Sequence, residues 1–173
     1  MLEKSENLVA SVVVGAVNDS LVNTVRRTGA MGTVFAEAIS EVVRWAIRGV
    51  AELGVDIGMA AKEALIGVLR GIKEVGGESH EAVSATAAAV IKSAAEVGGD
   101  LGSAAKGAVE GAIAGARAIG VSAEEAASAA AAGALKAAGE IGSTAVTQVR
   151  DAVTGTIAGV KVIIKEPFQS EKK

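Results

Sequence analysis

The sequence of 173 residues has no cysteine, no tyrosine, one proline and one histidine, and these absences exclude several kinds of chemistry. Without cysteine the chain can form no disulfide, no thiolate nucleophile and no cysteine-ligated metal site. A single histidine, His80, cannot build a multi-histidine metal centre. A formal net charge of −3 provides no basic field for binding nucleic acid. Aromatic side chains are limited to Phe35, Trp45 and Phe168.

The apolar residues are spread along the chain rather than gathered in membrane-length blocks. Most of them are small, since the sequence contains 37 alanines beside 22 glycines. Charged side chains occur throughout, and each one at the centre of a spanning helix costs about 2.5–3.5 kcal/mol. Residues 1–6 alternate in charge and lack the basic segment and apolar run of a secretory signal. We therefore expect a cytoplasmic protein that does not cross a membrane.

An aliphatic residue followed by glycine recurs every 22 residues, which indicates an internal repeat. The pairs are Met31-Gly32, Leu53-Gly54, Val75-Gly76, Val97-Gly98, Ile119-Gly120 and Ile141-Gly142. Alternate copies differ, because one class carries Glu37, Glu81 and Glu125 at matching positions while the other carries a GxxxG motif. The unit is thus 44 residues with two distinct halves. We divide the chain into a diverged half-repeat (1–31), three repeats (32–75, 76–119 and 120–163) and a polar tail (164–173).

Each half of the repeat has the composition and 3.6-residue spacing of a helix. Because 22 residues equal six turns of 3.67, one continuous helix would also keep its polar stripe in phase. Glycine followed closely by a capping residue instead favours a break, as at Gly120, where Ser122 and Glu125 form a capping-box pattern. Such short links make consecutive helices antiparallel. We predict an all-α fold of tandem antiparallel hairpins, in a bundle or an open solenoid-like array, with turns at Gly54, Gly76, Gly98, Gly120 and Gly142.

Small residues form a flank along every second helix and predict close contact between helix backbones. The GxxxG motifs place this packing seam at Gly67, Gly71, Gly111, Gly115, Gly155 and Gly159. Alanine buries little area, and burial stabilises by only about 25 cal/mol per Å², so we expect neighbouring copies of the chain to add stability. Antiparallel arms also predict three ion pairs, namely Glu37–Lys73, Glu81–Arg117 and Glu125–Lys161.

Trp45 is the most informative single residue because its column of the repeat otherwise holds mostly small residues. An indole there would block the close packing used elsewhere, so Trp45 either ends the array, is buried against the N-terminal segment, or anchors a partner. No motif for a nucleotide, cofactor or catalytic nucleophile is present, and His80 is expected to be a solvated residue near a turn. We therefore predict no enzymatic activity, no metal site and no cofactor.

The 11/22-residue period resembles that of exchangeable apolipoproteins, perilipins and group 3 late-embryogenesis proteins, and the alanine-rich helices resemble those of phasins. The resemblance covers period and composition over residues 32–163 and implies a coat on lipid or polymer droplets. Two features depart from it: the repeats lack proline, which apolipoprotein repeats usually carry, and they have little lysine-rich polar face.

Two functions therefore compete. The first is a structural protein that self-assembles through alanine- and glycine-rich helix faces into a homo-oligomer or filament. The C-terminal end supports it, because Val160, Val162, Ile163 and Ile164 are apolar where a terminal repeat needs a polar cap, so head-to-tail joining would cover both ends. The alternative is an amphipathic droplet coat.

Overall fold

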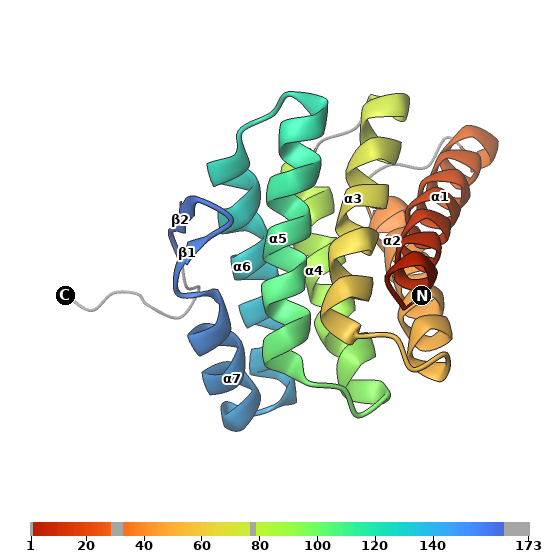
Figure 1. The fold of residues 1–173 in the computed structure, drawn as a ribbon. Coiled ribbons are helices and arrows are strands. Elements are labelled where there is room, and N and C mark those ends of the chain that lie inside the picture. Colours follow the sequence, from red (N-terminus) through yellow and green to blue (C-terminus); the bar gives the residue numbers. More distant parts are fainter. Residues whose placement is uncertain (1, 29–32, 77–78, 165–173) are drawn as a thin grey trace.

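The structure is a computed structural model that describes residues 2–28, 33–76 and 79–164. These residues form helices followed by a short β-hairpin (Figure 1). The helices are α1 (Leu2–Thr28), α2 (Thr33–Glu52), α3 (Ile57–Val75), α4 (Ser79–Glu96), α5 (Leu101–Ile119), α6 (Ala123–Ile141) and α7 (Ser143–Val153), and the strands are β1 (Gly155–Ile157) and β2 (Val160–Val162). The all-α array predicted from the sequence is confirmed.

Repeating glycines lie at the links between the helices, and three of the helices, α3, α5 and α6, begin at polar capping residues. Gly76 and Gly120 adopt the left-handed conformation, at φ 76° and 82°, and each donates its N–H to the last turn of the helix that it ends. Glycine accepts this conformation without the steric cost of a Cβ atom. Gly54, Gly98 and Gly142 also have positive φ values and lie at the other links. Asp56, Asp100 and Ser122 then accept N–H groups of the first turns of α3, α5 and α6.

The helices are arranged in two layers, because the largest contacts join helices two apart in the chain. One layer contains α1, α3, α5 and α7, and the other contains α2, α4 and α6 (Figure 1). Consecutive helices are antiparallel and lie in opposite layers, so neighbours within one layer are parallel. The molecule is therefore a short two-layered solenoid with α1 and α2 at one end and α7 with the hairpin at the other.

Glycines bring neighbouring helices of one layer into backbone contact. A Cβ atom added to Gly111 would collide with the carbonyl oxygen of Lys62 in α3, and one added to Gly133 would collide with that of Ser84 in α4. At Gly67 it would lie 2.9 Å from the carbonyl oxygen of Val14 in α1. Gly71 and Gly115 likewise lie against Leu21 and Leu69. The packing seams thus join α1 to α3, α3 to α5, and α4 to α6.

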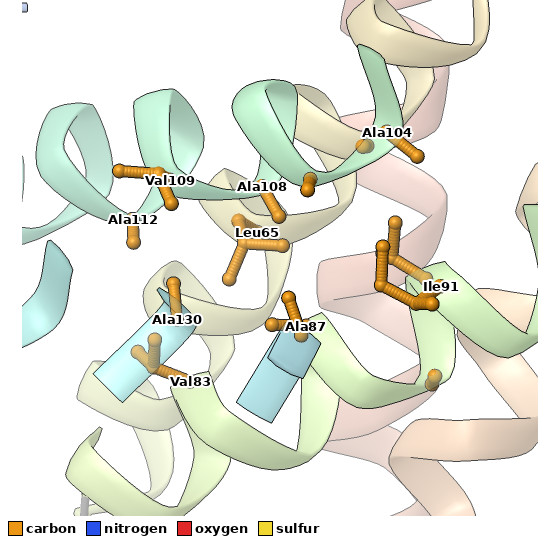
Figure 2. Packing of buried hydrophobic residues seen from close by; sticks show 14 of the residues in the cluster. Leu65, Val83, Ala87, Ile91, Ala104, Ala108, Val109, Ala112 and Ala130 are labelled. Carbon is orange, nitrogen blue, oxygen red and sulfur yellow. The ribbon is translucent and has the colours of Figure 1, made fainter. Parts of the chain in front are cut away.

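The larger aliphatic side chains fill the space between the two layers. Figure 2 shows Leu65 of α3 among Ala87 of α4, Ala108 of α5 and Ala130 of α6. All four side chains are fully buried. Leucine and isoleucine thus supply the core between layers, whereas glycine and alanine set the distance between helices within a layer.

The prediction of a helix through Gly155 and Gly159 is wrong. Helix α7 ends at Val153, and the strands β1 and β2 follow, with Ile157 paired to Val160. Ala158 and Gly159, which form the connection, have φ values of 51° and 82°, as in a type I′ turn. The run from Val160 to Ile164 is rich in β-branched residues, which favour strands over the helix of the other copies. Neither Gly155 nor Gly159 lies in a helix seam, and within the ranges that the structure describes only the guanidinium of Arg117 comes within 4 Å of the Cβ position at Gly159.

The three predicted ion pairs are also wrong. Among the described residues the pairs are Arg44–Glu96 at 3.0 Å, Arg48–Glu96 at 3.7 Å and Lys92–Glu140 at 3.0 Å. They join parallel neighbours in the layer of α2, α4 and α6. Glu37 and Lys73 lie on the consecutive helices α2 and α3, and Glu81 and Arg117 lie on α4 and α5, so each pair is divided between two layers. Lys161 lies in strand β2 and not in the predicted helix.

We predict that Gly111→Ala lowers the free energy of unfolding by about 1–3 kcal/mol, because the added methyl group forces α3 and α5 apart. Gly15→Ala is the matched control, because Gly15 also lies within a helix and no atom of the described residues comes within 4 Å of its Cβ position. Alanine there favours the helix by about 1 kcal/mol. Urea denaturation of both variants measures the difference. Equal stabilisation by the two substitutions would contradict backbone contact at the seam.

Candidate functional site

The charged side chains of the described residues do not gather into a reactive centre. No three histidine, aspartate or glutamate side chains in this part of the chain lie close enough to hold a metal ion. His80 is exposed beside a small depression of about 30 Å³ that Ser79, Ser122 and Glu125 also line. The features that distinguish regions of the surface are furrows along the glycine seams and an apolar face at one end.

The furrow between α3 and α5 lies outside Gly107 and measures about 480 Å³. It is lined by charged residues of both signs, including Lys62, Glu63, Lys106 and Glu110. Burial raises the pKa of Glu63 above its usual value and outweighs the opposite effect of Lys62 and Arg70. Opposite charges alternate along this furrow, so it has no single sign with which to select a charged ligand.

The apolar face lies on α2, at the end of the array. Ala38, Val42, Trp45 and Gly49 follow one another at helical spacing, and we call them the α2 stripe. The equivalent residues are buried in the two later helices of the layer: Ala82, Thr86, Ala89 and Ser93 in α4, and Ala126, Ala130, Gly133 and Ala137 in α6. In α6 this stripe faces the preceding helix of its layer, since Gly133 lies on Ser84 of α4. In the described part of the chain no helix precedes α2 in its layer, and along its stripe Trp45 and Gly49 are exposed while Ala38 and Val42 are partly exposed.

Trp45 lies in the middle of the α2 stripe and is 63% exposed. Beside it runs an apolar groove of about 350 Å³ between α1 and α2. Val12 of α1 and Leu53 at the end of α2 line the groove and are 59% and 71% exposed. Large apolar side chains exposed together in this way are typical of an interaction surface.

The first helix of the other layer carries polar residues at the equivalent stripe. Ala64, Gly67 and Gly71 of α3 correspond, 44 residues earlier, to Ser20, Asn23 and Arg27 of α1. Asn23 and Arg27 are exposed. A polar outer face is what a terminal helix of a repeat array needs. At this end of the molecule, therefore, the C-terminal half of α1 presents a polar cap for its layer, whereas α2 presents an apolar stripe.

The opposite end of the array carries α7 and the β-hairpin, and two of the four apolar residues expected to be uncovered there are buried, whereas Ile163 is 59% exposed. Val160 and Val162 are buried within the chain itself, as is Ile157. Strand β2 contacts α6, where the hydroxyl of Ser128 donates a hydrogen bond to the carbonyl oxygen of Ile163 at 2.8 Å. Val160 and Val162 were expected to be uncovered because this segment was predicted to be a helix.

The remaining residues of the open face could have been found from the sequence. Trp45 was singled out there, whereas Val42, Gly49 and Leu53 were not. Comparing the residues at matching repeat positions of α2, α4 and α6 would reveal them, once it is known which positions face the preceding helix of the layer. That direction follows from the contact between Gly133 and Ser84, which only the structure supplies.

We predict that Glu63→Gln stabilises the protein at neutral pH. The folded state favours the protonated carboxyl of Glu63, so its contribution to stability is greatest below the unfolded pKa and is lost as the pH rises through the folded pKa. The difference in free energy of unfolding between variant and wild type should therefore grow as the pH rises above the unfolded pKa of glutamate, about 4.3. Glu74→Gln, on the exposed side of the same helix, controls for the change of charge alone. A difference that does not vary with pH would rule out burial as the cause.

Comparisons with known proteins identify no family for this chain. No protein-family model matches the sequence, and a search of curated proteins finds no matching relative. Among the described residues, no helix is both long and apolar enough to cross a bilayer. The open face of α2 thus has to be interpreted from its own geometry.

Proposed function

We propose that the protein is a non-enzymatic structural protein that associates with copies of itself through the open apolar face of α2. The observation that carries this proposal is the α2 stripe, whose counterparts in α4 and α6 are buried against a neighbouring helix. A helix from a second copy can supply the neighbour that α2 lacks. The contact would then repeat a type of packing that the chain already uses internally.

The energetics of the array favour such an addition. Each alanine–glycine contact within the array removes little apolar area from water, so the fold gains modestly from each helix pair. Trp45, Val12 and Leu53 are apolar side chains larger than alanine, and they remain largely exposed. Tryptophan in a desolvated contact is among the side chains that contribute most to association.

A droplet coat is the second interpretation, and the disposition of the apolar side chains favours it less. Coat helices place a continuous apolar face on the lipid surface. Here the apolar faces of α3, α4, α5 and α6 are occupied by one another. The array would have to open before these helices could bind a droplet, whereas a second copy of the chain can bind the α2 stripe without rearrangement.

We predict that Trp45→Glu weakens self-association at least tenfold and leaves the fold intact. A charge at the centre of the contact has to be desolvated, while its present exposure means that folding does not depend on the indole. Sedimentation velocity over a range of micromolar concentrations measures the association, and circular dichroism checks the helicity.

Val121→Glu is the matched control, because Val121 is an exposed apolar residue in the turn between α5 and α6, away from the α2 stripe. It should sediment as the wild type does. A wild type that remains monomeric throughout, or a Trp45→Glu variant with unchanged association, would reject self-assembly through this face. Co-sedimentation of intact protein with liposomes would instead favour the droplet coat.

A further inference from the structure

We infer that self-association through the α2 stripe closes as a two-fold dimer, and that the C-terminal β-hairpin is the element that prevents head-to-tail growth. This inference rests on the proposed function. Head-to-tail growth would require the α2 stripe of one copy to pack on the outer face of α6 in another. The hairpin covers this outer face along the N-terminal half of α6.

The internal packing identifies which residues of α6 a following helix would use. Ser84 of α4 receives Gly133 of the next helix in the layer. The equivalent residue of α6 is Ser128, 44 residues later. Its hydroxyl is bonded to the carbonyl oxygen of Ile163, so the end of β2 lies where a following helix would pack. The hairpin therefore competes with a further copy for one surface.

The hairpin is held firmly to its own chain. Ile157, Val160 and Val162 are buried in the core cluster, at 5%, 6% and 7% exposure. The guanidinium of Arg117 in α5 donates a hydrogen bond to the carbonyl oxygen of Ala158 at 3.3 Å. These contacts tie the turn and both strands to α5 and α6, so the cap stays in place while the core is folded.

The charged side chains retain the pattern of a longer array. Arg48 contacts Glu96 and Lys92 contacts Glu140, so each cation meets a glutamate 48 residues later, in the next helix of the layer. The next cation is Lys136 of α6, and the first glutamate is Glu52 of α2. Both are exposed, and the described part of the chain offers neither of them an ion pair. In a head-to-tail contact Lys136 would meet Glu52 of the following copy.

With growth blocked at α6, the α2 stripe can meet only the same stripe of a second copy. Such a contact is isologous and closes after two copies. Glu41 and Arg48 are both exposed on one flank of the stripe, two turns apart, with Trp45 between them. Arg48 keeps its 3.7 Å contact with Glu96 of its own chain and is exposed enough to meet a second carboxylate as well. An antiparallel α2 pair centred near Trp45 places Glu41 of each copy opposite Arg48 of the other. Opposite charges thus meet twice across the two-fold axis.

The first experiment detaches the hairpin in the full-length chain with Val160→Asp and Val162→Asp together. The wild type should form a dimer whose size no longer grows once it is saturated. The detached variant should form open-ended polymers that lengthen with concentration, visible by sedimentation and negative-stain electron microscopy. Adding Lys136→Glu should return it to dimers, and adding Glu52→Lys as well should restore the polymers. A detached variant that keeps its helicity and remains dimeric would overturn the inference.

The second experiment does not depend on the hairpin. Glu41→Arg should raise the dimer dissociation constant at least tenfold, because two pairs of like charges then meet, and Glu41→Arg with Arg48→Glu should recover most of the loss. If the detached variant loses its helicity, the charge exchange alone tests the two-fold dimer. A double variant that dimerises no more tightly than Glu41→Arg alone would reject the two-fold arrangement. A wild type that polymerises without limit rejects two-fold closure while leaving self-association standing, whereas a monomeric wild type rejects the proposed function itself.

Discussion

The contact between helix backbones two apart in the chain is the constraint on which the other features depend. Glycine at Gly107, Gly111 and Gly133 lets parallel helices meet at carbonyl oxygens of the neighbour. This contact fixes the spacing within each layer, and that spacing lets Lys92 reach Glu140. It also determines which side of every helix faces its predecessor. Trp45 is significant for this reason: it lies on the side of α2 that would face the preceding helix of the layer, and the described part of the chain has no such helix.

Much of the architecture could be predicted from the sequence, because its determinants are local. The positive φ angles at the links require glycine, and Asp56, Asp100 and Ser122 cap the helices that follow. The neighbours across the seams could not be predicted in the same way. A 22-residue period states which residues share a face but not which helix covers that face. The ion pairs failed for this reason: pairing between hairpin arms was assumed, whereas charges meet along a layer.

The C-terminal hairpin shows where a repeat pattern misleads. Gly155 and Gly159 repeat the GxxxG spacing of the earlier copies, which favours a seventh full-length helix. The alternation of buried Val160 and Val162 with exposed Lys161 and Ile163 is instead that of a strand. Few residues of this segment have the alanine-like helix propensity of the earlier copies, and a two-residue turn of Ala158 and Gly159 was available. The last half-repeat keeps the columns of the array but adopts a structure that ends it.

The two ends of a repeat array decide what the array can assemble into. An array that offers complementary surfaces at both ends grows without limit, and one capped at both ends stays single. Here the outer face of α1 carries polar Asn23 and Arg27, the outer face of α2 carries Trp45, and the far end of the array carries the hairpin. Among the described residues, the α2 stripe is then the apolar helix surface left for a second copy. If this surface binds a second copy of the chain, as we propose, the two copies would meet through the same surface, and the geometry of the ends would turn an extendable repeat into a finite assembly.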